Sequence, residues 1–343
     1  MKLPWTAVEL SARLSQRVES IEIMQSLRAR DASALLRLRL HGDLSPTPRT
    51  GPLRTVILKR WIGTALQPSA RAELRFHLEF APAMHADFVT EVYAADQGEA
   101  DSWLLMEDLT LKYEHPRLPL QLTQLEAAVD ALSALHGFWW EHPRLAKADL
   151  LHPVNDVTRM PQALPLEGIQ HHADLATHAL EGFRSAHETA FTQSDWRLLE
   201  DWLAMWPRIF AQRTSALKSI TLLHGDFHLL GNTFFAPRDA TTIKVIDWAQ
   251  HKRGIGAHDL AYALLSAGDE TRLERDERLI QRYQTGLERC GVIGYDLELC
   301  RWDYRFCLLT NPFQSVFQNS PRWLRRNLDV ARIWGLEDWM RGL

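Results

Sequence analysis

The sequence lacks the features that mark membrane-spanning, disulfide-rich and nucleic-acid-binding proteins. No run of about 18 consecutive apolar residues occurs, so no segment has the composition of a membrane-spanning helix. The three cysteines, Cys290, Cys300 and Cys307, lack the paired spacing of a metal site, and we expect buried thiols in a reducing compartment. A formal net charge of −4, from 39 basic and 43 acidic residues, argues against nucleic acid as a partner.

The first residues also lack the apolar stretch of a signal peptide, because Pro4, Glu9 and Arg13 interrupt it. Thr6 and Glu9 have instead the spacing of a capping box, which predicts a short amphipathic helix. With 343 residues, 46% of them hydrophobic, the chain can bury a substantial core in one two-lobed domain or two modest domains. We therefore expect a soluble, cytoplasmic, globular protein.

The first hundred residues contain patterns that are typical of β-strands. Residues 34–40 (ALLRLRL) alternate with period two, residues 54–61 form a second apolar segment, and the Gly- and Pro-containing stretch between them predicts a turn. Residues 69–80 predict a helix that is capped by its first serine and ends at Pro82. A short apolar strand is expected at residues 103–106.

The rest of the chain is predicted to be mainly helical. Over residues 122–139 apolar side chains recur every three or four positions, and Thr123 and Glu126 have the spacing of a capping box. Residues 271–289 repeat this period and stop before a glycine. Residues 321–343 predict one terminal helix that contains several tryptophans.

The most informative segment is HGDFHLLGN, residues 224–232, which is followed by Asp247 in the apolar segment IKVIDW. One carboxylate in such a loop can orient a hydroxyl nucleophile, and an amide oxygen can hold a metal. A second aspartate after a short hairpin can hold the same metal from another side. The compound pattern predicts phosphoryl transfer from a magnesium-bound nucleotide, although each acid alone would more often be an exposed loop residue.

This motif, in a chain whose small strand-rich lobe (residues 1–108) precedes a larger helical lobe (residues 109–343), resembles the protein-kinase-like superfamily of small-molecule kinases. That superfamily includes the aminoglycoside phosphotransferases, the choline kinases and the ecdysteroid-kinase-like proteins. The resemblance implies a bilobal α+β fold, in which an antiparallel-sheet lobe binds nucleotide and the helical lobe binds substrate and carries out catalysis. It implies that Asp226 orients the acceptor hydroxyl and receives its proton, and that Asn232 and Asp247 bind Mg²⁺.

The same resemblance extends upstream to nucleotide-binding residues. Lys59 ends the segment VILK, as the family's phosphate-binding lysine does, and Glu73 matches the glutamate that pairs with it. The run LLMEDL, which contains Glu107, resembles the inter-lobe hinge whose backbone contacts adenine. A lysine at a strand end and an acid on a helix are, taken alone, more often exposed to solvent. ATP and Mg²⁺ are the cofactors that the resemblance implies.

Residues that support the loop are implied in the same way. The segment GAHDLA resembles the family's Gly-x-x-Asp-Leu-Ala, whose aspartate, here Asp259, braces the catalytic loop from behind. We expect His224 to fix the loop by hydrogen bonds rather than to transfer protons. His228 stands where protein kinases have a lysine near the γ-phosphate, so it either contacts phosphate or supports the loop. Trp139, Trp140, Trp248 and the tryptophans near the C-terminus either line a substrate pocket or, as is more common, belong to the core.

The sequence departs from the family's pattern in two places. Asn232 follows Asp226 by six positions, where most relatives have five, and the doubled leucine of HLLG is the expected extra residue. Residues 25–33 (QSLRARDAS), where a Gly-rich loop would cover phosphate, contain no glycine. Phosphate contacts there would have to come from backbone amides, from Ser33 or from the two arginines of this segment.

We therefore expect an enzyme that moves the γ-phosphoryl group of ATP to a hydroxyl of a small organic molecule. The alternative is a weak or inactive kinase-like protein that senses a nucleotide or a metabolite. A protein kinase ranks last, because the Arg of His-Arg-Asp, the Gly-rich loop and an Ala-Pro-Glu segment are missing. The acceptor would be selected by helices within residues 150–218, whose dispersed acidic residues do not identify it.

Overall fold

The computed structural model describes residues 3–30, 32–44, 46–47, 51–52, 55–147, 166–214, 216, 218–267 and 272–343. The chain groups into two compact units, of which the first comprises Met1–His115 and Phe234–Gln250 and the second comprises Pro116–Thr233 and His251–Leu343. A segment from late in the sequence is thus part of the first unit. The assignment of nucleotide binding to residues 1–108 and of catalysis to residues 109–343 stays a prediction.

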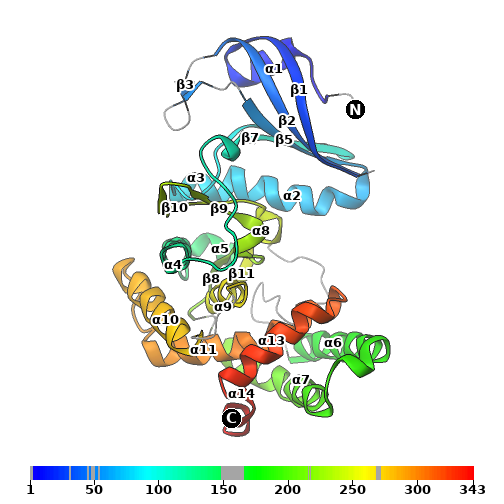
Figure 1. Cartoon of the computed structure of the whole chain (residues 1–343), viewed down its shortest axis with the longest axis vertical. Helices are drawn as coiled ribbons and strands as arrows, with labels where there is room; N and C mark the ends of the chain where they lie inside the picture. Colours follow the sequence, from blue (N-terminus) through cyan, green and yellow to red (C-terminus); the bar gives the residue numbers. More distant parts are fainter. Residues whose placement is uncertain are drawn as a thin grey trace. The chain divides into compact units, whose positions relative to one another are not determined.

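The first unit contains a five-stranded antiparallel sheet with the strand order β1-β2-β5-β7-β6 (Figure 1). The main elements of this unit are α1 (Ala7–Leu14), β1 (Arg17–Arg30), β2 (Ser33–Asp43), β5 (Thr55–Ile62), α2 (Gln67–Arg75), α3 (Ala81–Met84), β6 (Val92–Asp96) and β7 (Asp101–Glu107). Its shorter elements are β3 (Pro46–Thr47), β4 (Gly51–Pro52), the 3₁₀ turns η1 (Thr64–Leu66) and η3 (Leu109–Leu111), and the π-helical segment η2 (Phe76–Phe80).

Strand β2 shows why this sheet has two buried faces. Its predicted alternation is confirmed, since Ala34, Leu36, Leu38 and Leu40 are buried on one face. That face packs against Trp103 and against Leu10 of α1. Residues of the opposite face, with Ile57 and Leu104, pack against Leu74 of α2. Helices α1 and α2 therefore cover opposite faces of the sheet, as Figure 1 shows.

The helix predicted for residues 69–80 begins and ends elsewhere. Helix α2 begins at Gln67 directly after η1, and its N-cap residue, Leu66, makes no side-chain hydrogen bond, so the expected serine cap is wrong. Pro82 does not end the helical segment, because η2 continues into α3 and places the proline in the first turn, where a missing N–H costs little. The segment ends at His85, whose φ is 50°.

The late segment of the first unit is a hairpin of β9 (Thr233–Ala236) and β10 (Asp239–Val245), followed by η5 (Trp248–Gln250). The Trp248 ring stacks on Phe76 of η2 with 3.8 Å between the ring centroids. Val245 forms a bridge with Val89, and its carbonyl accepts a hydrogen bond from Thr90 Oγ1 at 3.1 Å. These contacts hold the end of β10 against the helical segment that begins with α2.

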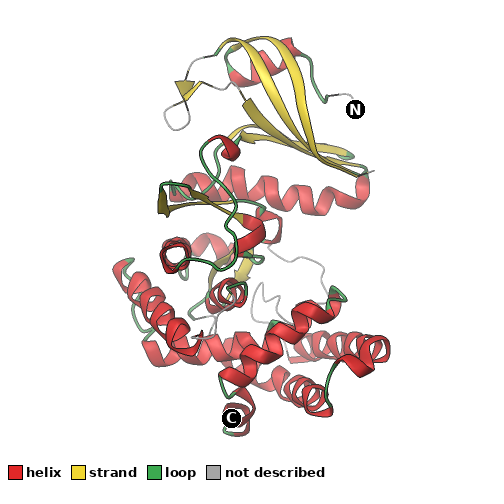
Figure 2. Cartoon of the chain, viewed as in Figure 1, coloured by secondary structure: helices red, strands yellow, loops and turns green. Residues whose placement is uncertain are grey.

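The second unit is mainly helical (Figure 2). Its helices are α4 (Leu122–Phe138), α5 (Pro143–Lys147), α6 (Leu166–His187), α7 (Gln193–Thr214), α8 (Leu229–Asn232), α9 (Ala257–Leu265), α10 (Arg272–Arg289), α11 (Leu297–Thr310), α12 (Pro312–Phe317), α13 (Pro321–Ile333) and α14 (Leu336–Arg341), with a 3₁₀ turn η4 (Glu188–Ala190). Two short strands, β8 (Thr221–Leu223) and β11 (Lys252–Gly254), pair antiparallel. The sheet of the first unit and the helices of the second agree with the predicted α+β class.

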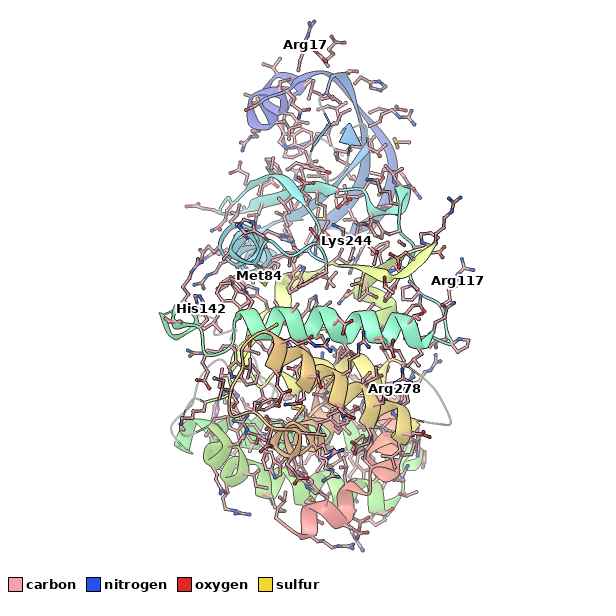
Figure 3. All side chains as sticks on the ribbon, turned by 90° about the vertical axis from the view of Figure 1, so that its left-hand side faces the viewer. Arg17, Met84, Arg117, His142, Lys244 and Arg278 are labelled. Atoms are coloured by element: carbon pink, nitrogen blue, oxygen red, sulfur yellow. The ribbon has the colours of Figure 1, made fainter. Side chains whose placement is uncertain are left out.

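Helices α4 and α10 pack side by side, and an ion pair joins them. Arg278 of α10, labelled in Figure 3, places Nη2 2.7 Å from Glu126 Oε1 of α4. The start of α4 is closed by Gln121 N, which donates to Gln124 Oε1 at 3.0 Å, and not by the predicted box of Thr123 and Glu126. The prediction was wrong because the carboxylate of Glu126 pairs with a helix that is distant in sequence.

The last residues form two helices where one was predicted. Helix α13 ends at Ile333, and α14 starts after Gly335, whose φ of 59° breaks the helical path. The cysteines also differ from expectation, because Cys300 and Cys307 are buried but Cys290 is exposed. Within the described ranges, no helix has the length and apolarity needed to cross a membrane.

Candidate active site

Three of the predicted site residues meet inside the first unit. Lys59 lies on β5 and its Nζ is 2.5 Å from Glu73 Oε2 of α2 and 2.8 Å from Asp247 Oδ1. Glu73 is 1% exposed, whereas the side chain of Asp247 is 45% exposed. One cation thus bridges a buried carboxylate and a carboxylate that faces solvent.

The burial of this group changes its ionisation. Burial raises the pKa of Glu73 to about 7, although the charge of Lys59 opposes the change. Burial also opposes the charge of Lys59, but the two carboxylates outweigh it and raise the pKa of the lysine. Asp247 adopts a left-handed backbone conformation with a φ of 65°, which aspartate tolerates better than most residues. Such conformations are concentrated at functional sites.

Glu107, predicted in the hinge, is the last residue of β7, which lies between β5 and the edge strand β6. Its backbone N–H donates to Glu91 O at 3.0 Å, so that donor is already used. Its Oε2 lies 3.4 Å from Lys244 Nζ, a buried lysine of β10 that is labelled in Figure 3. Adenine contacts from this residue would therefore have to come from its carbonyl group.

The HGD segment of the second unit is held by Asp259 of α9. Asp259 is fully buried and accepts hydrogen bonds from His224 N at 2.6 Å and from Gly225 N at 2.9 Å. His136 Nε2 of α4 lies 3.3 Å from the same carboxylate. Gly225 has a φ of 82°, a conformation that favours glycine. His224 is also buried, and its Nδ1 accepts from Asp226 N at 3.2 Å.

Asn232 returns to Asp226 despite the longer spacing between them. Its Nδ2 donates to Asp226 O at 2.8 Å and lies 3.3 Å from Asp226 Oδ2. The extra residue is accommodated in the single turn of α8, where Leu229 is buried and His228 is the N-cap. His228 Nδ1 accepts from Gly231 N at 3.1 Å, which gives this histidine a structural contact in the loop.

The oxygen atoms of these residues fit Mg²⁺. The Nδ2 of Asn232 donates to Asp226. The amide oxygen Oδ1 of the same side chain receives no hydrogen bond from any described residue. Within the part of the chain that the structure describes, no cluster of three His, Cys, Asp or Glu side chains could hold a metal alone. Mg²⁺ usually binds through one or two carboxylates together with phosphates and water. Asp247 in the first unit and Asn232 in the second each offer an oxygen of the kind that such an ion binds.

The sequence did not identify several residues beside the loop. The His228 ring lies 5.4 Å from Trp323 of α13 and 6.2 Å from Tyr262 of α9, measured between centroids. Arg326, one turn along α13, places its guanidinium 5.6 Å from the Trp323 ring. The tryptophans near the C-terminus, Trp323 among them, were candidates for a substrate pocket, but nothing in the sequence linked Trp323 or Arg326 to residue 228. Trp139 and Trp248 are fully buried core residues.

The glycine-free segment, residues 25–33, forms the end of the hairpin of β1 and β2. Arg30 pairs with Ser33 in the register, so the turn between the strands is short. The expected phosphate contacts from Arg30 lie outside the described side chains. Gln25 is engaged with Arg37, whose Nη1 donates to Gln25 Oε1 at 3.1 Å.

Comparison with known proteins assigns the chain to a family. A model of the phosphotransferase enzyme family matches residues 49–293. None of the curated proteins matches the sequence. Among solved structures, the ternary complex of streptomycin, ATP and APH(2'')-IIa is 15% identical, covers 93% of each chain and has a TM-score of 0.51. Aminoglycoside phosphotransferase APH(3'')-Id from Streptomyces rimosus, in complex with ADP and streptomycin, is 18% identical over 81% of this chain and 90% of that chain, with a TM-score of 0.48.

At such low identity the solved structures establish the fold alone, which is the bilobal, kinase-like α+β fold that the sequence predicted. The family match covers more than half of the chain and confirms the predicted class of enzyme, a kinase that acts on hydroxyl groups. The chain belongs to the phosphotransferase enzyme family.

Proposed function

We propose that this enzyme transfers the γ-phosphoryl group of ATP to a hydroxyl of a small organic molecule. The observation that carries the proposal is the position of Lys59 Nζ between Glu73 and Asp247, at 2.5 and 2.8 Å. In kinases a lysine held by a glutamate contacts the nucleotide phosphates, and a nearby aspartate binds the metal that bridges them. Asp247 lies 188 residues after the lysine, so proximity along the chain does not account for the contact.

In this scheme the first unit holds the nucleotide. Glu73 keeps Lys59 extended towards the α- and β-phosphates, and Asp247 contributes a carboxylate oxygen to Mg²⁺. When bound, Mg²⁺ neutralises charge on the phosphates and orients them for transfer. Glu107 contributes its backbone carbonyl to the adenine site, because its N–H is used within the fold.

The second unit aligns the acceptor. Asp226 is partly exposed and takes the proton of the acceptor hydroxyl, while Asn232 adds its amide oxygen to the metal. Asp259 and His224 fix the backbone on the N-terminal side of Asp226 through the hydrogen bonds described above. The chain's residues thus act by positioning and by charge neutralisation, without a covalent intermediate.

Replacing the proposed base provides the test. Asp226→Asn keeps the size of the side chain but cannot accept the hydroxyl proton, so turnover should fall by about 10²–10⁴-fold. Binding of Mg²⁺ with ATP should remain largely intact, because Lys59, Glu73 and Asp247 are unchanged. We would measure ADP release with a small-molecule extract as the source of acceptor, and nucleotide binding by calorimetry. Mass spectrometry of the same reaction identifies the metabolite that gains a phosphate.

Asp201→Asn is the matched control, because Asp201 is exposed on α7 and belongs to no proposed site. It should retain wild-type ADP release. If Asp226→Asn kept a near-normal rate, the role of Asp226 as the base would be excluded. If the wild type bound nucleotide but no extract supported Mg²⁺-dependent ADP release, the alternative of an inactive nucleotide sensor would replace the proposal.

A further inference from the structure

The charge of the acceptor can be inferred from side chains beside the catalytic loop, an inference that rests on the proposed function. Three rings meet there, since Trp323 lies 5.4 Å from His228 and 6.0 Å from Tyr262, and Tyr262 lies 6.2 Å from His228. His228 is two residues after Asp226 in the same loop. The group of rings therefore adjoins the residue that we expect to align the acceptor.

One nitrogen of an arginine beside these rings has no hydrogen-bond partner among the described residues. The Arg326 guanidinium lies 5.6 Å from the Trp323 ring, and its Nη2 is buried without a hydrogen-bond partner among the described residues. A buried guanidinium nitrogen that makes no hydrogen bond carries the full cost of its lost hydration. On α12, Gln314 donates weakly to Tyr262 Oη at 3.5 Å, while its buried Oε1 also has no partner among the described residues. Buried polar atoms without a protein partner are usually satisfied by ordered water, an ion or a ligand.

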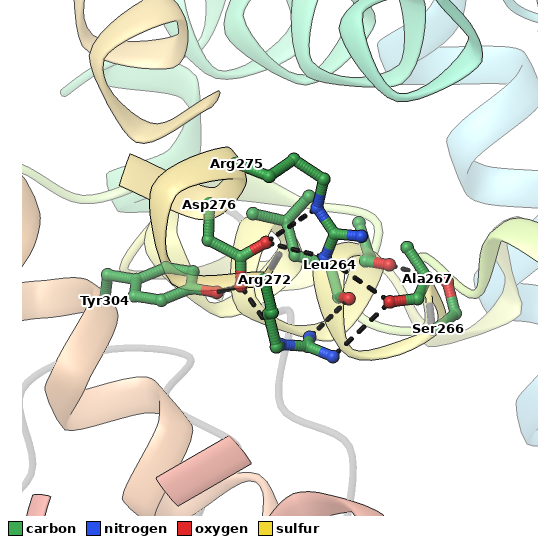
Figure 4. Close-up of polar contacts among 8 residues, drawn as sticks. Leu264, Ser266, Ala267, Arg272, Arg275, Asp276 and Tyr304 are labelled. Carbon is green, nitrogen blue, oxygen red and sulfur yellow. Dashed lines mark hydrogen bonds and ion pairs between the residues drawn. The ribbon is translucent and has the colours of Figure 1, made fainter. Parts of the chain in front are cut away.

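The surroundings of Arg326 carry an excess of positive charge. Arg272 and Arg275 share one carboxylate, Asp276, at 3.1 and 2.8 Å (Figure 4). Tyr304 Oη donates to the same carboxylate at 3.1 Å, and Arg272 Nη2 donates to Leu264 O at 2.5 Å. These contacts fix both arginines on the protein, and Asp276 accepts from both of them.

The other charges near Arg326 are of the same sign. Arg322 precedes it by one helical turn on α13, is exposed and makes no ion pair with any described residue. Burial lowers the pKa of Arg326, and the charges of Arg272, Arg275 and Arg322 lower it further. Burial likewise lowers the pKa of His228, and the charge of Arg326 adds to this effect while that of Asp226 opposes it. An anion bound among these groups would relieve the repulsion.

We propose that Arg326, with Arg322 beside it, binds an anionic group of the acceptor, a carboxylate or a phosphate, so that the substrate is a hydroxylated acid. The planar guanidinium of arginine matches both groups by paired hydrogen bonds. The buried acceptor atom of Gln314 suits a hydroxyl of the same molecule. A cationic acceptor, such as an amino sugar, would meet charges of its own sign at Arg326 and Arg322.

The γ-phosphate of ATP is the other anion that could reach these arginines. We favour the acceptor because the nucleotide phosphates already have a cation in Lys59, which Glu73 and Asp247 hold in place. The two sources differ in their kinetic consequences. Loss of a contact to the acceptor raises the KM for the acceptor, whereas loss of a contact to the γ-phosphate raises the KM for ATP or lowers kcat at saturating acceptor.

The test uses the full-length protein with Arg326→Gln, which removes the charge, and Arg326→Lys, which keeps it. Arg325→Gln is the matched control on the same helix, because Arg325 faces Phe191 at 4.6 Å and Asp195 at 3.8 Å. Anion exchange and cation exchange divide a small-molecule extract into anionic, neutral and cationic fractions, and ADP release is measured with each. Binding of inorganic phosphate is measured by calorimetry in the absence of nucleotide.

We expect ADP release with the anionic fraction. Arg326→Gln should raise the KM for the active compound by about 10-fold to 100-fold, the usual range for a charged hydrogen bond, with little change in the KM for ATP. Arg326→Lys should recover part of the loss, and Arg325→Gln should behave as the wild type. Phosphate binding should weaken at least tenfold in Arg326→Gln only. Equal melting temperatures of the variants would show that folding is not responsible.

Other results would overturn the inference. ADP release confined to the neutral or cationic fraction would exclude an anionic acceptor while leaving the kinase activity standing. A raised KM for ATP in Arg326→Gln, with an unchanged KM for the acceptor, would assign the arginine to the nucleotide. If no fraction supported ADP release, the proposed function would fail. Loss of phosphate binding in Arg326→Gln would even then locate an anion site at Arg326. Phosphate binding that was unchanged in that variant would exclude such a site.

Discussion

At the scale of single residues, the ionisation of Asp259 matters most for the loop that carries Asp226. Burial of Asp259 opposes its charge, but His136, through its hydrogen bond and its charge, and the charges of His258 and His224 lower the pKa to about 2. The carboxylate therefore remains ionised throughout the ordinary pH range. It can then accept hydrogen bonds from the backbone of both His224 and Gly225.

Asp259→Asn should destabilise the protein by about 1.5–3 kcal/mol, the usual contribution of a charged hydrogen bond. The lowered pKa sets the pH dependence. The ionised Asp259 contributes to stability above pH 3.8, the pKa of the group in the unfolded chain, and this contribution is lost as the pH falls through the folded pKa of about 2. Urea unfolding of the two proteins should give a difference that persists at pH 5 and narrows towards pH 2. A difference that stayed constant from pH 5 to pH 2 would mean that Asp259 has the same pKa in the folded and unfolded states.

Site residues could be predicted from the sequence only where a local motif contains them. The acid, amide and lysine of the site follow recognisable segments, and the structure places Lys59 with Glu73 and Asp247, and Asp226 with Asn232. The extra residue in HLLG could not be judged from spacing, because its effect depends on how α8 turns. The roles of these residues in the reaction stay predictions.

At the scale of elements, α9 depends on a close approach at its first turn. Gly256 is its N-cap residue, and a Cβ built there would lie 2.3 Å from Tyr283 Oη and 3.0 Å from His136 Nδ1. These two atoms hydrogen bond to each other at 2.7 Å. The φ of Gly256, −56°, suits any residue, so glycine is required here only because a side chain would have no space.

Gly256→Ala should therefore destabilise the protein by about 1–3 kcal/mol, as overpacked cores do. Thermal or urea unfolding measures the effect. Gly182→Ala is the control, because Gly182 lies inside α6 and a Cβ there meets nothing within 4 Å. That substitution should stabilise the protein by about 0.5–1 kcal/mol through helix propensity. If the free energy of unfolding were the same for Gly256→Ala and the wild type, α9 would be able to shift without a loss of stability.

Helix and strand types were predicted more accurately than their ends. The alternation in β2 and the period of α10 are intrinsic to short segments, and both are confirmed. The start of α2 and the cap of α4 instead depend on η1 and on Arg278, which the local sequence does not reveal. The break at Gly335 was visible as a glycine, but the tryptophans on both sides favoured one continuous helix.

At the scale of the whole molecule, the three cysteines report on folding. Burial raises the pKa of Cys300 and of Cys307, which lie on α11, and Cys290 is the exposed thiol. The native protein should thus show one accessible thiol with Ellman's reagent, and three after denaturation. Cys290→Ser should remove the native signal, because the thiolate is the reactive form and the other two cannot reach solvent. Rapid reaction of all three in the native protein would contradict this arrangement.

Four arginines that interact in the folded second unit lie too far apart in the sequence to be recognised as a group. Basic residues are scattered along the chain, with no run that would predict a concentration of charge. Arg272 and Arg275 open α10, whereas Arg322 and Arg326 belong to α13, about fifty residues later. Only the packing of the second unit gives them a common electrostatic environment. Spacing along a chain cannot predict such a group, because it is formed by helices that meet after folding.

The late hairpin of the first unit has a consequence for biosynthesis. Lys59 and Asp247 are separated by 188 positions, so at about 5–20 residues per second the ribosome needs roughly 10–40 s to supply the second after the first. During that interval Phe76 has no Trp248 to stack on, and Lys59 has only Glu73 as a partner. A nascent chain that stops before residue 247 therefore lacks part of the proposed nucleotide site, however well its sheet has formed.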